Sequence, residues 1–497
     1  MNILFLYPKY PVTFWSFKYI LPYIGKKAAY PPLGLLTIAS LLPKEWNKKL
    51  IDTNFSPLTD KDIDWADMVF ISGMIVQKEH AQILIDWCKQ HNKIVVAGGP
   101  LFTTQHENFR NVDYFILGEA EITLLLFLKD FSKGRAKHFY ISNEHPDITK
   151  TPAPMWSLIN PHHYAAMCIQ YSRGCPFNCE FCDIIIMNGR IPRSKTSEQV
   201  LQELQAIYVT GWRGSVFIVD DNFIGNQKKV KELLVNIIKW QKQHNYPFVF
   251  FTEASINLAD DSELMKLMIK ANFSMVFLGI ETPEENSLKA IGKFQNINRN
   301  LNEAIRIIHN HGLMVMGGFI VGFDQDNENI FERQIRFIQQ TGIAVAMVGI
   351  LTALPKTRLW QRLKSENRLL EESTGDNTLA SLNFEPKMGS KNLIRGYAQL
   401  LSHIYAPKNY YRRIHTFLKD YHSRIRNNNR KVDFKAFFKC LWYIGVRSKQ
   451  KRYFWKLFFS TIIKRQDLAV AIKLAIYGVH FRKVAEKNMF EMQKQGI

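Results

Sequence analysis

The sequence predicts an α/β protein: an N-terminal doubly wound parallel sheet, then a partial (β/α)6 barrel, then a basic helical C-terminal extension. Short continuous apolar runs alternate with amphipathic stretches, as expected for parallel strands buried between helices. A polar, proline-bearing stretch divides these runs into two groups. Residues 401–497 carry 22 Lys and Arg but 5 Asp and Glu, which is +17 of the chain's total charge of +21. The expected parts are 1–135 (α/β domain), 136–165 (linker), 166–385 (barrel) and 386–497 (helical, basic domain).

The first part contains four apolar runs that we expect to be strands, at 2–7, 67–73, 93–99 and 113–119, and a helix-like stretch at 78–92. A doubly wound sheet binds its ligand at the carboxyl ends of its strands. Glycines at these ends let a bulky ligand approach the backbone, although glycine pairs suit tight turns equally well. The candidate ligand-binding residues at these ends are Ser72, Gly98, Gly99, Gly118 and Glu119.

The third part repeats a strand–helix unit six times, with strands expected at 168–172, 215–220, 248–254, 275–281, 313–322 and 344–351. Several helices between them have recognisable start signals. Thr196 with Gln199, and Asp260 with Glu263, resemble capping boxes, and Pro283 suits a first helical position. Six such units predict most of a parallel barrel, whose chemistry gathers at the carboxyl ends of the strands.

Polar residues and glycines follow five consecutive strands of this barrel, which predicts one ring-shaped site. They are the cysteine loop, then Asp220 with Asp221 and Asn222, then Glu253, then Glu281, then Gly317, Gly318 and Gly322.

Three cysteines in one loop, Cys175, Cys179 and Cys182, are the strongest chemical signal. Plain buried cysteines rarely gather so closely. A zinc site would need a remote ligand such as His162 or His163, because the usual second pair of cysteines is absent. An iron–sulfur cluster held by three thiolates would keep one iron open to another ligand. The chain's remaining cysteines, Cys88, Cys168 and Cys440, are scattered singly.

The spacing Cys-x3-Cys-x2-Cys after the first strand of a six-unit barrel resembles the radical S-adenosylmethionine (SAM) superfamily. In that superfamily the amino and carboxylate groups of SAM chelate the fourth iron, so the resemblance implies a [4Fe–4S] cluster and SAM as cofactors. It also implies a set of SAM contacts: an aromatic residue before the last cysteine, a carboxylate for the methionine ammonium, a carboxylate near the ribose and a strand along the adenine. On this chain they are Phe181, Asp220 or Asp221, Glu281, and Gly318 with Ile320 and Gly322, and we expect Glu253 in the same SAM site.

The first part resembles the cobalamin-binding domain that precedes such barrels. With the stretches "VDDNFIGN", "GIETP" and "GGFIVGF", the layout is similar to cobalamin-dependent radical SAM methylases, in particular the hopanoid C-2 methylase group. Many cobalamin domains place a histidine below the cobalt, but this chain has Asn54 at the corresponding position. We therefore expect cobalamin to be bound without a histidine ligand, with Asn54 in its site.

The resemblance implies C-methylation of an unactivated carbon in a lipid-like substrate, through a 5′-deoxyadenosyl radical and with an electron donor of the ferredoxin or flavodoxin type. A cobalamin-dependent rearrangement or cyclisation is an alternative, as is a zinc or iron–sulfur binding module without catalysis. A methylthiotransferase would need a second cluster in the first part, where Cys88 is the only cysteine.

The C-terminal part mixes large aromatics with lysines and arginines, which suits the interface of an anionic membrane. The aromatics are Phe437, Phe438, Trp442, Tyr443, Phe454, Trp455, Phe458 and Phe459. The alternatives are a helical core with solvated charges, or nucleic-acid binding, which we regard as less suited. Without a basic leader or a spanning apolar run, we expect a cytoplasmic protein, peripheral at the inner face of the membrane.

Overall fold

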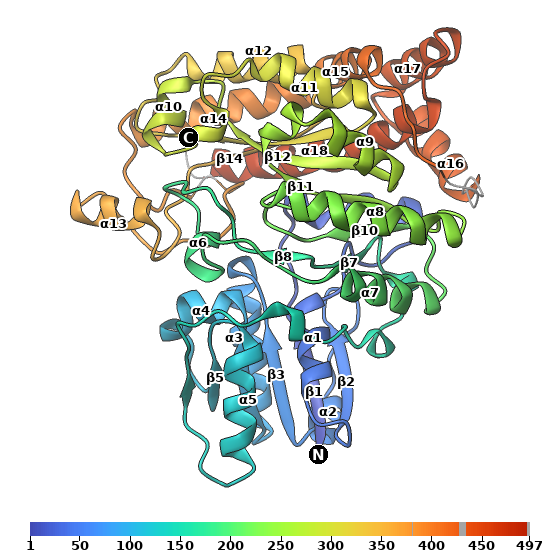
Figure 1. Cartoon of the computed structure of the whole chain (residues 1–497). Helices are drawn as coiled ribbons and strands as arrows, with labels where there is room; N and C mark the ends of the chain where they lie inside the picture. The colour runs from blue at the N-terminus through green and yellow to red at the C-terminus, as the bar shows by residue number, and fades with distance from the viewer. Residues whose placement is uncertain (380, 427–433, 495–497) are drawn as a thin grey trace.

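The computed structural model describes residues 1–379, 381–426 and 434–494 and confirms the predicted fold class (Figure 1). In this view the N-terminal sheet lies below and a second parallel sheet lies above it. Helices of the C-terminal part pack around the second sheet, away from the N-terminal sheet. Of the expected C-terminal domain, residues 427–433 and 495–497 lie outside the described residues, as does residue 380 of the expected barrel.

The N-terminal sheet has six parallel strands in the order β2-β1-β3-β4-β5-β6, with helices on both faces. Its strands are β1 (Asn2–Tyr7), β2 (Asn47–Asp52), β3 (Met68–Ser72), β4 (Ile94–Gly98), β5 (Tyr114–Ile116) and β6 (Phe139–Tyr140). Its helices are α1 (Leu33–Leu41), α2 (Asp60–Trp65), α3 (Lys78–Gln90), α4 (Pro100–Gln105) and α5 (Ala120–Phe131). The edge strand β2 was not predicted, and β6 comes from the stretch expected as a linker.

The second sheet is the predicted partial barrel, with six parallel strands in the order β7-β10-β11-β12-β13-β14. They are β7 (Met167–Ile169), β10 (Ser215–Ile218), β11 (Val249–Ala254), β12 (Phe273–Glu281), β13 (Met314–Val321) and β14 (Val345–Ile350), so all six expected strands are present. A short antiparallel pair, β8 (Ser172–Arg173) and β9 (Arg193–Ser194), frames the cysteine loop. The helices are α6 (Ile184–Met187), α7 (Ser197–Val209), α8 (Gln227–Gln243), α9 (Ser262–Lys270), α10 (Glu285–Ala290), α11 (Leu301–His311), α12 (Ile330–Thr341) and α13 (Arg358–Ser365).

Only one of the three predicted helix starts is correct. Thr196 and Gln199 form the capping box of α7. Helix α9 is capped by Asp261 rather than Asp260, because the Asp261 side chain accepts the hydrogen bond from the Leu264 amide. Helix α10 begins at Glu285, so Pro283 precedes the helix instead of opening it.

The inner face of the barrel keeps exposed surface near the carboxyl ends of its strands. Along β12, Phe277 and Gly279 are half-buried, whereas the alternate residues Leu278 and Ile280 are fully buried under helices. Because side chains alternate across a strand, the half-buried set faces the barrel interior. The inner face of the barrel therefore stays partly accessible at this end.

The C-terminal helices close the open side of the barrel together with an early segment of the chain. They are α14 (Ser390–Tyr405), α15 (Pro407–Asp420), α16 (Phe434–Cys440), the π-helix η10 (Leu441–Arg447), α17 (Lys451–Ile463) and α18 (Leu468–Lys494). Helix α18 packs on β14 and on the short helix η1 (Phe14–Ser16). The His480 ring nitrogen Nε2 lies 2.9 Å from the carbonyl oxygen of Phe14. Among the described helices, none combines the length and apolar composition that a membrane span requires.

Candidate active site between the two sheets

The cysteine loop leaves β8 at the carboxyl end of the barrel and turns sharply at Gly174. This glycine has a φ of +94°, and a Cβ added there would meet three carbonyl oxygens at 2.9–3.0 Å, those of Gly189, Asn188 and Ile191. No other residue fits, so Gly174 brings the two ends of the loop together. The Cys175 amide donates to the carbonyl oxygen of Gly189 and continues this closure.

The three thiols are close enough to influence one another's charge, Cys175 with Cys179 and Cys179 with Cys182, and amide donors are aimed at two of them. Among the described residues, no three Cys, His, Asp or Glu side chains are arranged as a site for a single metal ion. Asn222 Nδ2 lies 3.9 Å from Cys175 Sγ, and Gln295 Nε2 lies 3.9 Å from Cys179 Sγ. Burial raises the pKa of all three thiols, including that of Cys182. Three thiol donors with N–H groups directed at sulfur fit an iron–sulfur cluster, whose thiolates accept such hydrogen bonds.

A buried ion pair borders the thiols. Lys293 Nζ lies 2.6 Å from Glu281 Oε1, and both side chains are almost fully buried. Burial alone would lower the pKa of Lys293, but the charges of Glu281, Cys179 and Cys182 and the hydrogen bond to Glu281 together outweigh burial and raise it. The ammonium therefore stays protonated, and its charge opposes the rise in the pKa of Cys175, Cys179 and Cys182. Sequence reasoning missed Lys293, because no motif marks it.

The middle of the cysteine loop is held from two sides. The Glu180 amide donates to the carbonyl oxygen of Ile291, and the Leu359 amide donates to the carbonyl oxygen of Glu180. The Glu180 carboxylate lies 2.7 Å from Arg362 Nε, and Arg362 Nη1 lies 2.7 Å from Asp324. Helix α13, which carries Arg362, therefore fixes the position of the loop. A single sequence gives no signal for this contact.

The two aspartates after β10 have different surroundings. Asp220 is fully buried and accepts hydrogen bonds from the Tyr171 amide and from the amide and hydroxyl of Ser172. Asp221 is half-buried, and its carboxylate accepts a hydrogen bond from Asn188 Nδ2 at 3.2 Å. Burial raises the pKa of Asp220 to about 7 and that of Asp221 to about 6. Of the two residues predicted to hold the methionine ammonium, Asp221 has the freer carboxylate.

Glu253 lies on the inner face of β11 and is half-buried. No hydrogen-bond partner for its carboxylate is present in the described part of the chain. Burial, followed by the charges of Asp221 and Asp220, raises the pKa of Glu253 to about 8. At neutral pH its carboxyl group therefore holds a proton that it can donate in a hydrogen bond.

The predicted adenine-side residues lie along β13, next to the cysteine loop. Gly318 and Ile320 are half-buried on the inner face. A Cβ at Gly318 would meet the Phe277 ring at 2.8 Å, and one at Gly322 (φ +102°) would meet Leu393 at 2.8 Å. Phe181 packs on Phe323, with ring centroids 6.3 Å apart. The carboxyl end of β13 thus presents little side-chain bulk. That Phe181, Gly318, Ile320 and Gly322 contact SAM stays a prediction.

The carboxyl edge of the N-terminal sheet faces the barrel. Gly98 and Gly99 are required by the sheet itself, because a Cβ at Gly98 would meet the Ile116 carbonyl oxygen at 2.7 Å and one at Gly99 would strike Ser72 Oγ. Gly118, with a φ of +78°, also lacks room, since the Ser142 carbonyl oxygen would lie 3.3 Å from its Cβ. Backbone therefore forms much of this edge, which fits the close approach of a large flat ligand.

Glu119 joins the two sheets. Its carboxylate lies 2.6 Å from Arg173 and 2.6 Å from Arg193. These two arginines lie on β8 and β9, the antiparallel pair that frames the cysteine loop. Arg173 also lies 2.8 Å from Glu121. The carboxylate that we predicted to contact cobalamin is thus occupied by arginines, and it aligns the N-terminal edge with the cysteine loop.

Asn54 belongs to a polar network at the same edge. Its Nδ2 donates to Asp52 Oδ1 at 2.6 Å, and its Oδ1 accepts from the Tyr10 amide at 2.8 Å. Asp52 also accepts from the Tyr164 hydroxyl at 3.1 Å. Both ends of the Asn54 amide are engaged, so the side chain supplies hydrogen-bonding structure here rather than a metal ligand.

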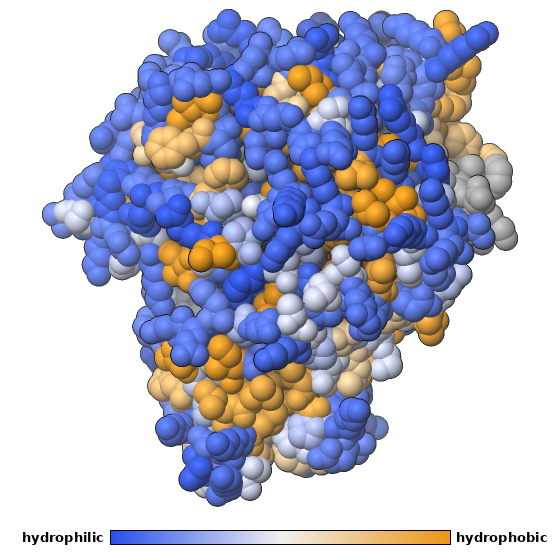
Figure 2. Space-filling model, in the orientation of Figure 1, coloured by the Kyte–Doolittle hydropathy of each residue, from blue (hydrophilic) through white to orange (hydrophobic). Residues whose placement is uncertain are grey.

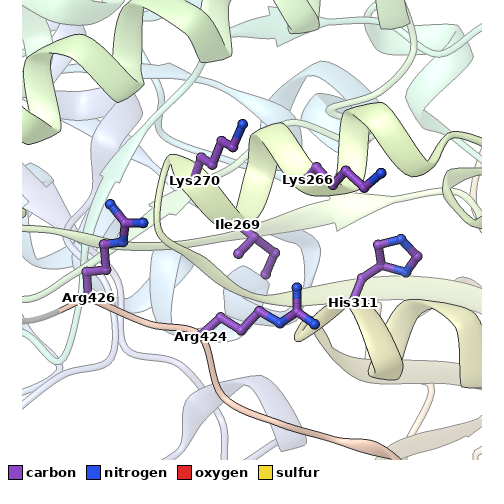
Figure 3. Close-up of a pocket in the computed structure, with 6 residues that line it drawn as sticks. All are labelled: Lys266, Ile269, Lys270, His311, Arg424 and Arg426. Atoms are coloured by element: carbon purple, nitrogen blue, oxygen red, sulfur yellow. The ribbon is translucent and has the colours of Figure 1, made fainter.

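A surface pocket lies elsewhere, between α9, the end of α11 and residues 424–426 (Figure 3). Lys266, Lys270, Arg424 and Arg426 extend around it. Helices α9 and α11 end where β12 and β13 begin, so the pocket lies at the amino ends of the strands. It is at the opposite end of the barrel from the cysteines and is separate from the candidate active site.

Comparison with known proteins agrees with this geometry. Residues 169–338 match the Radical SAM superfamily, and residues 357–494 match a domain of unknown function, DUF4070. The chain is 34% identical to the hopanoid C-2 methylase of Rhodopseudomonas palustris, over 98% of this chain and 94% of that protein. The chain belongs to the radical SAM superfamily. This radical SAM enzyme therefore uses SAM and a [4Fe–4S] cluster, and its cysteines are not those of a non-catalytic zinc module.

Two further similarities cover the whole radical SAM chain. It is 43% identical to "Uncharacterized methyltransferase sll1242" of Synechocystis, over 100% of this chain and 94% of that protein. The solved structure of OxsB, a cobalamin-dependent SAM radical enzyme, superposes with a TM-score of 0.64 at 15% identity, over 100% of this chain and 81% of that one. The second similarity shows that the two proteins share a fold.

Proposed function

We propose that the chain is a cobalamin-dependent radical SAM methylase that transfers a methyl group to an unactivated carbon of a hydrophobic, lipid-like substrate. The observation that carries the proposal is the meeting of two carboxyl edges: the backbone-rich edge of the N-terminal sheet faces the cysteine loop, and Arg173 and Arg193 bridge to Glu119 across the junction. Similarity to a hopanoid C-2 methylase and to a second methyltransferase supports methyl transfer.

The cofactors would supply the radical and the methyl group, with one electron from a donor of the ferredoxin or flavodoxin type. Cys175, Cys179 and Cys182 would hold the cluster, and Asp221, Glu281 and the β13 strand end would orient SAM. The glycine-rich edge with Ser72, Gly98, Gly99 and Gly118 would hold cobalamin, with no histidine below the cobalt. Asn54 and Glu119 would shape that edge through the contacts described above.

The lining of the barrel interior supports an apolar substrate. Trp15 lies 5.1 Å from Phe277 and 6.4 Å from Phe217 between ring centroids, and Tyr30 lies 5.4 Å from Phe217. These rings pack on one another, and together they would give a rigid hydrocarbon skeleton an apolar wall to bind through area burial. The protonated carboxyl group of Glu253, on the same inner face, could bond to one polar substituent.

The test uses the anaerobically reconstituted enzyme with cobalamin, SAM carrying a deuterated methyl group, a reductant and a bacterial lipid extract. Mass spectrometry should find a lipid that gains one labelled methyl group, and no such product when cobalamin is omitted. A product that is rearranged or cyclised without the label would replace the proposal with the alternative reaction. Peripheral membrane location belongs to the same proposal, because a lipid substrate resides there.

A further inference from the structure

The helices α16, η10 and α17 form a surface with large apolar side chains turned to solvent. Seven of them expose between 46% and 79% of their surface. They are Phe438, Trp442, Tyr443, Val446, Phe459, Ile462 and Ile463, and we call them the apolar ridge. Figure 2 shows hydrophobic residues along the upper right edge of the molecule, over α17.

The two halves of the apolar ridge are continuous. Phe438, Trp442 and Val446 are four residues apart along α16 and η10, so they share one side of the helix. The Trp455 indole nitrogen donates to the Gly445 carbonyl oxygen at 2.9 Å, which joins α17 to η10. Trp455 stacks on Phe459 with centroids 5.6 Å apart, and the isoleucines follow on the next turn.

Inward-facing residues of the same helices already form a hydrophobic core, so the apolar ridge is not needed to stabilise the fold. Phe454 and Leu457 of α17 are fully buried, as is Ile444 of η10. The sequence left three interpretations of these aromatics: a membrane interface, a packed core or a nucleic-acid surface. In the structure some of them are core residues and others are exposed. Exposed apolar patches of this kind mark interaction sites rather than stabilising a monomer.

The ridge is surrounded by positive charge. No acidic residue occurs between Asp433 and Asp467, and the exposed basic residues are Lys439, Arg447, Lys449, Lys451, Arg452, Lys456, Lys464 and Arg465. None of these eight pairs with a carboxylate among the described residues. Apolar and aromatic side chains ringed by free cations complement an anionic lipid surface, with rings at headgroup depth and cations near phosphate.

The surface also touches the segment that lines the barrel. The Tyr443 ring lies 5.6 Å from that of Tyr23, and Lys439 Nζ donates to the Pro22 carbonyl oxygen at 3.3 Å, both on the short helix η2 (Leu21–Ile24). The same segment supplies Trp15 and Tyr30 to the barrel interior. A bilayer at the ridge would therefore lie against the covering of the reaction site.

We propose that the apolar ridge and its basic border dock the enzyme on an anionic bilayer. The proposal rests on the proposed function only in expecting the substrate in that bilayer. The full chain is sedimented at one ionic strength with vesicles of phosphatidylglycerol and phosphatidylcholine, and with vesicles of phosphatidylcholine alone. The protein should pellet with the first and stay largely in solution with the second.

Two variants separate the components of binding. The substitutions Trp442→Ala, Phe459→Ala and Ile463→Ala should weaken vesicle binding about tenfold or more. Lys449→Gln, Lys451→Gln and Arg452→Gln should weaken it on the order of 100-fold, because each cation near an anionic surface contributes about fivefold. All six side chains point away from the core, and circular dichroism verifies that the variants fold.

Matched controls come from the N-terminal domain. Leu125→Ala with Leu126→Ala removes a second exposed apolar patch, on α5, and Lys133→Gln with Arg135→Gln and Lys137→Gln removes three exposed cations. Both controls should bind vesicles like the parent. The proposal would be overturned if the ridge variants bound vesicles as tightly as the controls do. It would also be overturned if the parent formed a dimer that the ridge variants dissociate, or if the parent bound single-stranded RNA more tightly than vesicles. Binding is measured without turnover, so a failure of methylation leaves this test intact.

Discussion

Arg362 on α13 and Glu180 in the cysteine loop form an ion pair with a nitrogen–oxygen distance of 2.7 Å, although 181 residues separate them in the chain. Arg362 lies in the region that matches the domain of unknown function, and Glu180 lies in the radical SAM match. One role of that C-terminal region is thus to hold the loop that carries the three thiols.

Replacing Arg362 by leucine should reduce iron incorporation during anaerobic reconstitution and destabilise the protein by about 1–2 kcal/mol. The Glu180 carboxylate loses its partner in a mostly buried position, and the partial exposure of Arg362 keeps the effect below that of a fully buried pair. Iron content and melting temperature measure the two effects. Arg395→Leu, at an exposed position on α14, should change neither, and equal iron loading in both variants would contradict the positioning role.

Alanine at Cys175, Cys179 or Cys182 should abolish the brown absorption of the cluster and SAM cleavage, since we propose that each thiol supplies one iron ligand. Iron analysis and visible spectroscopy after reconstitution measure the loss. Alanine at Cys88 or Cys440, both buried away from the loop, serves as the control and should leave iron content unchanged. Full loading in all three loop variants would show that the cluster is held elsewhere.

Lys293→Gln should make the cluster harder to reduce, by tens of millivolts, because it removes a buried positive charge beside the thiolates. It also leaves Glu281 without its cationic partner, which adds to the shift. A redox titration followed by electron paramagnetic resonance gives the potential directly. Lys289→Gln, at an exposed position on α10, should leave it unchanged. An unchanged potential in Lys293→Gln would place its charge outside the influence of the cluster.

Glu253 should make the apoprotein less stable as the pH rises from about 4.5 to about 8. Its pKa is raised in the folded state, so the folded chain keeps a proton that the unfolded chain releases, and this contribution is complete below pH 4.5 and lost above pH 8. Glu253→Gln should therefore lose less stability than the parent over this interval, by an amount on the order of a few kcal/mol. Melting temperatures at both ends of the interval test the difference, with the exposed Glu332→Gln as control. Parallel curves for parent and Glu253→Gln would refute the assignment.

Cobalamin reduced to Co(II) on the protein should give an electron paramagnetic resonance spectrum without superhyperfine splitting from a histidine nitrogen. The reason is that Asn54 stands at the expected histidine position and both ends of its amide bond to Asp52 and Tyr10. A threefold nitrogen splitting that disappears on substitution of a protein histidine would contradict this prediction. Absence of cobalamin binding would remove the proposed methyl carrier.

Periodicity allowed the buried strands to be predicted because they are continuous apolar runs, whereas the sequence of the edge strand β2, "NKKLID", is mostly polar and resembles a loop. The spacing of the three cysteines alone singled out their loop, and their role as cluster ligands stays a prediction. The roles of Lys293 and Arg362 were not predictable, because each depends on contacts between distant segments. The same holds for Asp220, whose carboxylate is occupied by hydrogen bonds from Tyr171 and Ser172. The cap of α9 was misplaced by one residue, since both Asp260 and Asp261 carry the side chain that a cap requires.

The packing of Phe14 and Phe17 against His480 and Phe481 affects how the chain is made. The early segment leaves the ribosome long before α18, and at 5–20 residues per second the interval is roughly 20 to 90 s. During that time these aromatic rings have no native partner on α18. The nascent chain thus presents an apolar segment that suits chaperone binding, and this side of the barrel stays uncovered until α18 has been synthesised.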